Sequence, residues 1–412
     1  MPLIAKIAYR NLIRHLRRTL LTVASISFGL AVVLWLQCLL AGRNKHIIQS
    51  ITSTYIGQVQ VYRKEYLKDH VINFSFPEVP KGFAEMLPKG SRFSPRMHLP
   101  ALVSSGEAST PMILEGIDPE SESTITTIKQ SLKEGSFLEP DLTPECESHQ
   151  IYIGRAMADI LNVKVGNKIV ILAQATDGSL GNDLFRVKGI YDSGSPQFNK
   201  TYAFAPMSCV KKVGALTGIH EITIQLPFEA DDSLVREKLS ALLPTGLVVT
   251  TWRQAVPNMA AMVKFNDAML LMISTILFTV ITFGIVNSLL MSVFERTREF
   301  GTMISLGTTP AQVRLMVVAE SLFMAIASTV FGIILGGAAV LYHRKFGFDL
   351  RPFLGEAKSI DNFLLDLTVY PEFKFVPFLK ATSITILFVL CAGLYPAIRA
   401  SRLNPNDAMR GN

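Results

Sequence analysis

The sequence predicts an α-helical membrane protein with four transmembrane helices and a large mixed α/β extracytoplasmic domain inserted between helices 1 and 2. Three observations predict this class. The 412 residues are 49% hydrophobic and only 18% charged, whereas soluble proteins average roughly 25% charged residues. The excess apolar residues gather in a few long uncharged runs. One long polar stretch separates the first of these runs from the others.

The charge pattern and the absence of known motifs exclude several function classes. The net charge is +7, but much of the basic excess lies at the ends of apolar runs, as in cytoplasmic loops of membrane proteins. We therefore expect a lipid bilayer as partner and no nucleic acid. The sequence contains no Walker A motif, zinc-type spacing, GxSxG motif or dinucleotide fingerprint. We expect no catalytic residue, no metal site and no cofactor bound by this chain.

The first predicted span follows a basic segment. Residues 1–18 carry only basic charges and are predicted to form a cytoplasmic N-terminal helix. Residues 19–42 lack any charge and are long enough to cross a hydrocarbon core of about 30 Å. A cleaved signal peptide is the alternative, but this run is too long for one and lacks an Ala-x-Ala site. We interpret it as a retained transmembrane helix.

Residues 43–264 form the predicted extracytoplasmic domain, which is large enough to bury its own core. Alternating apolar and polar residues predict half-buried strands at 58–62, 185–188 and 221–226, and residues 168–172 predict a more buried strand. Helices are expected at 155–161 and 233–243. Two cysteines, Cys146 and Cys209, lie in this domain, and the sequence leaves open whether they form a disulfide.

Three further spans are predicted at residues 265–294, 310–342 and 375–398, with an extracytoplasmic loop at 343–374 and a cytoplasmic tail at 399–412. Gly332 and Gly336 suit close helix packing. Asn287 is the amide of the second span, and we expect it to form a hydrogen bond between helices. Glu320 is an ionisable residue in the third span and by default a functional candidate, but its shallow depth favours an interfacial partner such as Arg314.

Residues 295–309 are predicted to form a short charged helix between the second and third spans. Leu306 and Gly307 indicate a helix end. Thr309, Pro310 and Gln312 then indicate a new helix start, with threonine as the N-cap and proline at the first helical position. Such a helix at a membrane surface suits contact with a partner. The alternative is an ordinary solvated loop.

Three sequence blocks resemble the MacB/FtsX/Lol permease family. The first comprises residues 295–301, ERTREFG, with Leu306, Gly307 and Glu320. The second is the tail at 395–410, YPAIRASRLNPNDAMR. The third, residues 153–170, is similar to a block of the family's outer domain. With one span before and three after a large outer domain, the resemblance covers the whole chain.

This resemblance implies an ABC system in the bacterial inner membrane, with both termini cytoplasmic. A separate dimeric ATPase subunit would bind ATP and Mg²⁺, and a second permease, identical or different, would complete the complex. The family uses ATP-driven motion to act on substrates already outside the membrane. The residues that the resemblance assigns to ATPase coupling are Glu295, Arg296, Arg298, Glu299, Gly301, Leu306 and Gly307.

Size and the unfused ATPase resemble the lipoprotein-releasing branch, which implies an acyl-chain cavity at the outer ends of spans 1 and 2. The candidates are Trp35, Cys38, Leu39, Met262, Met269 and Ile273. Their alternative role is lipid contact or packing. The family's carrier-recruiting subunits have an extended hook where this chain has only residues 176–182, so carrier docking is in doubt. A MacB-like exporter working with an adaptor, and an FtsX-like regulator of a hydrolase, remain alternatives.

Overall fold

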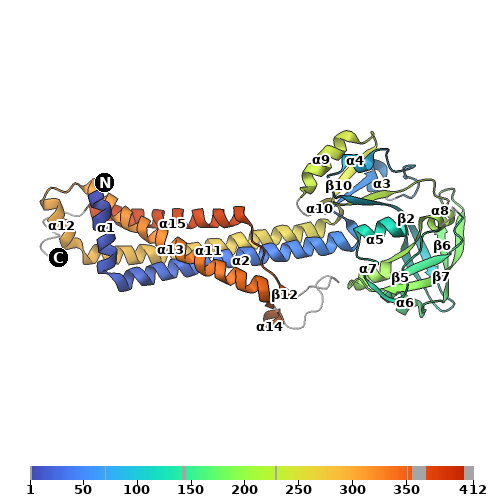
Figure 1. Ribbon diagram of the computed structural model, residues 1–412, viewed down its shortest axis with the longest axis horizontal. Coiled ribbons are helices and arrows are strands. Elements are labelled where there is room, and N and C mark those ends of the chain that lie inside the picture. Colours follow the sequence, from blue (N-terminus) through green and yellow to red (C-terminus); the bar gives the residue numbers. More distant parts are fainter. Residues whose placement is uncertain are drawn as a thin grey trace. The chain divides into compact units, whose positions relative to one another are not determined.

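The computed structural model describes residues 2–69, 71–141, 145–227, 230–349, 351–354 and 368–402. The chain divides into two compact units (Figure 1). The helical unit comprises Met1–Lys45, Val263–Gly355 and Leu367–Asn412, and the sheet unit comprises His46–Met262 and Glu356–Asp366. Residues 403–412 of the predicted tail, including Arg410, and most of the predicted loop after residue 354 lie outside the described residues.

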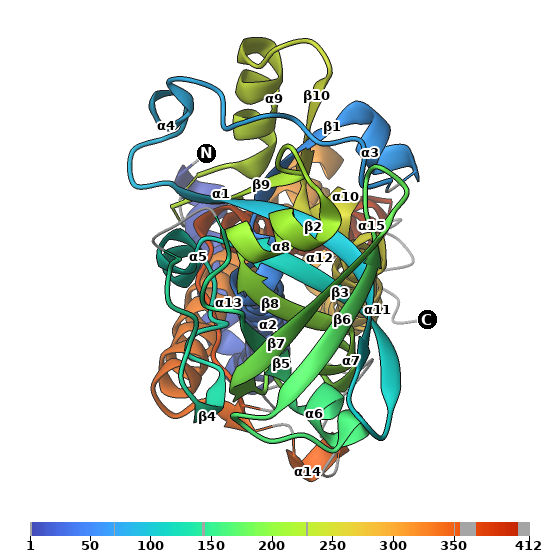
Figure 2. The same ribbon diagram turned by 90° about the vertical axis from the view of Figure 1, so that its right-hand side faces the viewer.

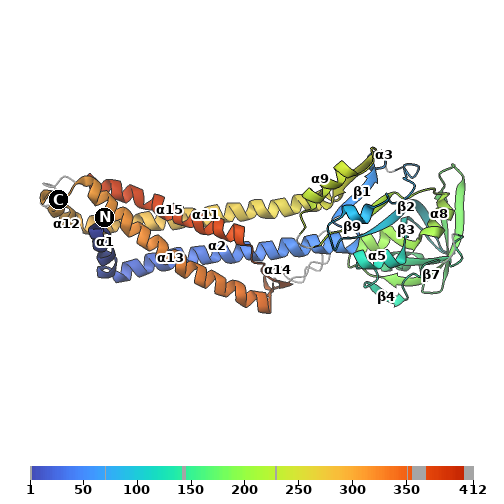
Figure 3. The same ribbon diagram turned by 45° about the horizontal axis from the view of Figure 1, so that its top comes forward.

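Within the described residues, four helices, which lie mostly in the helical unit, are long and apolar enough to cross a membrane (Figure 3). These are Leu16–Ile56, Pro257–Glu295, Pro310–Phe346 and Phe375–Ser401. The first is α2 (Leu16–Ile51) continued by a π-helical turn, η1 (Thr52–Ile56), and the others are α11, α13 and α15. Because about 20 residues suffice to cross a bilayer, these helices identify a multi-pass membrane protein. Shorter elements of the unit are α1 (Pro2–Arg14), α12 (Thr297–Ser305), α14 (Arg351–Leu354), β11 (Phe348–Asp349) and β12 (Thr368–Val369).

Small residues allow these long helices to pack closely. A Cβ atom added at Gly332 would lie 2.8 Å from Leu30 Cδ2, and one added at Gly336 would lie 3.1 Å from Ala31 Cα. Gly332 and Gly336 of α13 therefore contact α2, which confirms the predicted close packing. A buried cluster from α2, α11, α13 and α15 joins the four helices.

The sheet unit is built on a ten-stranded sheet (Figure 2). Its strands are β1 (Val59–Arg63), β2 (Arg92–Ser104), β3 (Ser109–Ile117), β4 (Leu132–Gly135), β5 (Gln150–Gly154), β6 (Lys168–Gln174), β7 (Leu180–Tyr191), β8 (Tyr202–Pro206), β9 (Glu221–Gln225) and β10 (Leu247–Thr251). The order is β10-β1-β9-β2-β3-β8-β5-β7-β4, and β6 pairs with both β2 and β7. Strands β2, β3, β8, β5, β7 and β6 thus close into a ring, with β9, β1 and β10 extending from the first half of β2.

Short helices connect these strands, so the unit is a mixed α/β domain as predicted. They are α3 (Lys64–Asp69), α4 (Phe83–Met86), α5 (Pro119–Ile125), α6 (Arg155–Leu161), α7 (Pro196–Thr201), α8 (Met207–Gly214), α9 (Asp232–Leu242) and α10 (Trp252–Ala255). Side-chain caps fix several starts: Asp118 caps α5, Asp231 caps α9, and Thr251 forms a capping box with Gln254 at α10.

The predicted strands and helices are present, but the predicted burial of three strands is wrong. Strand β1 was expected to be half-buried, yet residues 59–61 are all buried. Strand β6 was expected to be the more buried one, yet it alternates and leaves Val170 38% exposed. A strand of a closed ring has one inner and one outer face, which produces this alternation. Strand β9 was expected to be half-buried, but Glu221 to Ile224 are all buried. It lies between β1 and β2, away from the sheet edges.

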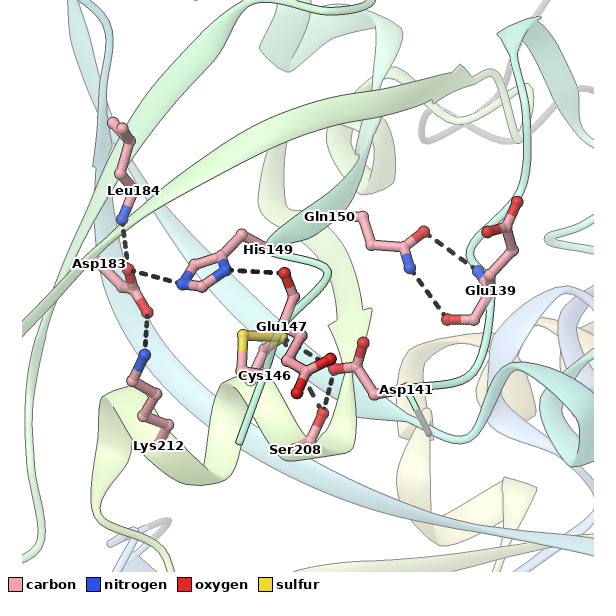
Figure 4. Close-up of a disulfide and its surroundings, with 11 residues drawn as sticks. Glu139, Asp141, Cys146, Glu147, His149, Gln150, Asp183, Leu184, Ser208 and Lys212 are labelled. Carbon is pink, nitrogen blue, oxygen red and sulfur yellow. Dashed lines mark hydrogen bonds and ion pairs between the residues drawn. A yellow bond between two sulfur atoms is a disulfide. The ribbon is translucent and has the colours of Figure 1, made fainter. Parts of the chain in front are cut away.

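Cys146 and Cys209 form a disulfide, which ties the segment before β5 to α8 (Figure 4). Polar contacts order the surrounding loop. Ser208 Oγ donates to Asp141, and the Gln150 side chain accepts from the Glu139 backbone N–H and donates to the Glu139 carbonyl, both at 3.1 Å. The sequence left open whether these two cysteines form a disulfide, and the structure shows that they do.

Candidate functional site

The candidate site is the end of the helical unit where α12 lies between α11 and α13 (Figures 1 and 3). Helix α11 ends at Glu295, and Arg296 breaks the helix with φ −109° and ψ 14°. Gly307 follows α12 with φ +99°, a conformation that favours glycine. Thr309 and Gln312 then form a capping box with Pro310 at the first position of α13. The predicted stop and restart are both confirmed.

One side of α12 is anchored by apolar packing. Phe300 is fully buried in a cluster with Val293, Val313 and Val317, to which α1 and α15 also contribute. Met303 and Ile304 pack against the same cluster. Gly307, predicted on this side, is exposed instead because the helix has already ended. Five helices therefore meet around one buried ring, that of Phe300.

A buried ion pair fixes α12 to α13. Glu320 Oε1 accepts hydrogen bonds from Arg296 Nη1 and from Asn11 Nδ2, each at 2.8 Å. Arg296 is 5% exposed and Glu320 is 4% exposed. The guanidinium also donates to Glu299 at 3.0 Å and lies over the Phe300 ring at 4.8 Å. A buried charge needs such complete pairing.

The prediction that Arg314 is the partner of Glu320 is wrong. Arg314 precedes Glu320 by six residues on α13, so the two side chains point about 120° apart around the helix. Arg314 is accordingly exposed while Glu320 is buried. The prediction considered only charges on α13 and therefore missed Arg296, which lies between α11 and α12.

The acidic residues of this segment are paired with arginines of the N-terminal helices. Arg18 donates to Glu295 at 2.6 Å and to Ser292 at 2.7 Å. Arg14 donates to Glu299 at 3.1 Å. These pairs are partly exposed, so each contributes little to stability. The sequence signal was the run of basic residues before the first span, which was assigned only to membrane orientation.

The remaining side of α12 is exposed. Arg298, Thr302 and Ser305 lie three or four residues apart, so they share one helix face. Leu306 follows at the end of this face and is 82% exposed. We call these four residues the outer face of α12. Arg298 and Leu306 are therefore accessible to a partner.

The structure divides the seven predicted coupling residues into two groups. Glu295, Arg298, Glu299, Leu306 and Gly307 are exposed, whereas Arg296 and Gly301 are buried. The buried residues position α12, and the exposed ones are available to a partner. The coupling role itself stays a prediction.

The six predicted cavity residues occupy different environments. Cys38 and Leu39 are buried, and the Cys38 carbonyl accepts a hydrogen bond from the Glu372 N–H at 2.9 Å. The Trp35 indole N–H donates to His343 Nδ1 at 3.2 Å. Met269 is exposed, and Met262 and Ile273 are half-buried. The assignment of these residues to an acyl-chain cavity stays a prediction.

The four apolar helices found among the described residues, combined with a mixed α/β domain, define a multi-pass membrane protein. The MacB-like periplasmic core domain matches residues 19–242, and the FtsX-like permease C-terminal domain matches residues 271–405. The chain therefore belongs to the ABC-transporter permease family of the MacB, FtsX and Lol type.

Relatives with assigned names agree with this family. The chain is 23% identical over 329 residues to the lipoprotein-releasing system transmembrane protein LolC of Xylella fastidiosa, covering 78% of each chain. It is 22% identical over 343 residues to LolE of Haemophilus influenzae, again covering 78% of each. It is 32% identical over 128 residues to the macrolide export ATP-binding/permease protein MacB of Chlorobaculum tepidum, covering 31% of this chain and 16% of that protein.

Proposed function

We propose that this chain is the permease subunit of an ABC mechanotransmission complex that releases lipoproteins from the outer leaflet of the bacterial inner membrane. A separate ATPase subunit binds ATP and Mg²⁺ and supplies the motion. The observation that carries the proposal is α12: a short helix between two spans, fixed by a buried ion pair, with one exposed face. Likeness to LolC and LolE over 78% of the chain supports the lipoprotein substrate.

The proposed orientation places both termini and α12 in the cytoplasm. Basic residues gather in α1, at the start of α2 and at the end of α15, as expected for cytoplasmic segments. The sheet unit then lies in the periplasm. The disulfide between Cys146 and Cys209 supports this, because disulfides persist in oxidising compartments. On this reading residues 19–42, 265–294, 310–342 and 375–398 cross the membrane, and residues 43–264 and 343–374 lie outside.

The geometry at α12 explains how an ATPase would move the spans. A force on the outer face reaches α13 through the Arg296–Glu320 pair and reaches α1 and α15 through the Phe300 cluster. Both routes are closely packed, and packed groups transmit displacement because they cannot deform freely. Motion of the ATPase would therefore shift several spans together instead of only bending a loop.

The proposed complex contains a second permease, identical or different. Two features of α11 support this. Gly284 and Asn287 are exposed along the helix, and a Cβ atom added at Gly284 meets no atom within 4 Å. Within the described residues, the Asn287 amide forms no side-chain hydrogen bond, although we expected one between helices. An amide in lipid is costly unless it finds a partner, and a second permease would supply that partner.

Export in the manner of MacB is the second candidate function. The connection between β6 and β7 is only the turn 175–179, so the chain lacks the extended hook expected of a carrier-recruiting permease. This observation favours either a lipoprotein-binding subunit whose partner recruits the carrier or an exporter that uses an adaptor.

Gentle purification of the native complex tests the substrate class. We expect an ATPase and triacylated lipoproteins in the purified complex, and ATP should release the lipoproteins in the presence of a periplasmic carrier. A complex that retains an ATPase and an adaptor but no lipoprotein would favour the exporter. Retention of a cell-wall hydrolase would favour an FtsX-like regulator.

A further inference from the structure

The sheet unit contains a cavity of about 600 Å³ that the proposed function does not use. This volume is in the range of small-molecule sites. It lies against β2, β3 and β9 and is bordered by η1, α7 and α10. The residues that matter for its chemistry are Tyr55, Tyr62, Tyr66, His98, Glu115, Phe198, Tyr202 and Glu221.

Aromatic rings form much of the cavity wall. Tyr202 lies 4.6 Å from Phe198 and 5.0 Å from Tyr55 between ring centroids. Tyr62 and Tyr66 stack at 6.1 Å. Clustered aromatic faces attract cations through the negative potential of the ring. One such contact already exists, because the buried guanidinium of Arg96 lies 4.2 Å from the Tyr55 centroid.

A cluster of charged residues lies at and behind this wall. Arg96 forms two hydrogen bonds to Glu122, at 2.6 and 3.1 Å, and both side chains are fully buried. His98 lies between two carboxylates, with Nδ1 2.7 Å from Glu115 and Nε2 2.9 Å from Glu221. Burial alone would lower the pKa of His98, but the two carboxylates raise it to about 10. Three carboxylates therefore face two cations in a buried cluster.

Within the described residues, two buried atoms of this cluster lack a hydrogen-bond partner: Glu115 Oε1 and Arg96 Nη1, which lies 3.9 Å from Glu221 Oε1. Both oxygens of Glu221 are used, by Thr223 Oγ1 at 2.6 Å and by His98. Glu115 Oε2 is used by His98, but Oε1 of this fully buried residue has no hydrogen-bond partner in the part of the chain that the structure describes. Leaving a buried carboxylate oxygen unpaired is unfavourable. A donor entering the cavity would satisfy it.

We propose that this cavity binds an organic ammonium ion, whose N–H group donates to Glu115 Oε1 and whose apolar body lies among the tyrosine rings. The excess of carboxylates favours a cation, and the aromatic wall favours an organic one. A Ca²⁺ ion fits less well because it requires six to eight oxygen ligands, whereas among the described residues the cluster offers one carboxylate oxygen without a partner.

The ligand would also touch the segments that connect the sheet unit in sequence to two spans. Ile51 ends α2 and Tyr55 belongs to η1, while Gln254, Ala255 and Val256 directly precede α11. A ligand bound in the cavity would therefore contact the segment after α2 and the segment before α11 at the same time.

Equilibrium dialysis of the purified full chain in detergent, with radiolabelled phenethylamine as the probe, tests the site directly. We expect one phenethylammonium per chain, bound at least about tenfold more tightly than the neutral analogue 2-phenylethanol. Glu115→Gln should weaken binding by at least about tenfold. Glu237→Gln changes an exposed glutamate of α9 and should have no effect.

A second variant covers the case in which Glu115→Gln does not fold. Ala255 is an exposed residue that borders the cavity, so Ala255→Trp should obstruct entry, with a similar loss of binding, while the domain stays folded. Equal binding of the alcohol and the amine would overturn the proposal. Unchanged phenethylamine affinity in Ala255→Trp and in folded Glu115→Gln would also overturn it.

Discussion

Removing the Glu320 carboxylate tests the buried ion pair that fixes α12 to α13. Glu320→Ala leaves the Arg296 guanidinium, 5% exposed, without its buried partner, and Asn11 loses its acceptor. The gross attraction at 2.8 Å is about 6 kcal/mol at an effective dielectric constant near 20. Breaking one partner of a buried pair costs about 3–5 kcal/mol. Because Glu299 still accepts from Arg296 at 3.0 Å, we expect the lower end, about 3 kcal/mol.

Unfolding of the detergent-solubilised protein by added sodium dodecyl sulfate measures this change, and hydrogen exchange of the α12 amides shows where it acts. Protection of α12 should fall. The double variant Arg296→Met with Glu320→Leu removes both charges and should regain most of the stability, since apolar pairs replace buried ion pairs well. A loss below about 1 kcal/mol for Glu320→Ala, with unchanged exchange in α12, would refute the buried-pair reasoning.

Three further predictions concern the outer face, the disulfide and the buried histidines. Arg298→Glu should abolish co-purification of the ATPase, whereas Arg236→Glu on exposed α9 should not; equal recovery would contradict the coupling role. Reversing Glu295 and Glu299 should also weaken the complex, but those residues pair with Arg18 and Arg14, so α12 would loosen as well. Replacing Cys146 and Cys209 with serine should destabilise the sheet unit by about 4 kcal/mol, because the bond closes a loop with a sequence separation of 63; chemical denaturation that finds no change would contradict this. Stability should be greatest near pH 6.5. The pKa of His98 is raised to about 10, so its contribution to the free energy of unfolding is complete below pH 6.5 and is lost as the pH rises to about 10. Burial lowers the pKa of His220 to about 4, so its contribution is complete above pH 6.5 and is lost as the pH falls to about 4. In thermal unfolding across pH, His98→Gln should flatten only the alkaline side, and a profile unchanged in that variant would count against the assignment.

Much of the fold was predictable because its signals are local. Uncharged runs identified the apolar helices, alternation identified β1, β7 and β9, and the Thr309 capping box identified the start of α13. Contacts distant in sequence were not predictable in this way. The pairing of β6 with both β2 and β7 closes the ring, yet each strand shows only its own alternation.

The same limit applies to the candidate site. Sequence reasoning selected Arg296 and Glu320 separately but did not pair them, because the pair forms only when α11 turns back at residue 296. Nor did it find the buried cluster around His98, whose members come from β2, β3, α5 and β9. Charged residues in alternating strands look like solvated positions until a second layer covers them.

Site-specific cross-linking from α12 tests the central claim most directly. A photo-reactive residue at Leu306, which is 82% exposed, would be compared with one at Leu234, an exposed leucine of α9, in membranes containing the native complex. We predict a cross-link between position 306 and an ABC ATPase, with none from position 234, and ATP should change its yield. No ATPase adduct from position 306 in an intact complex would contradict the assignment of α12 as the coupling element.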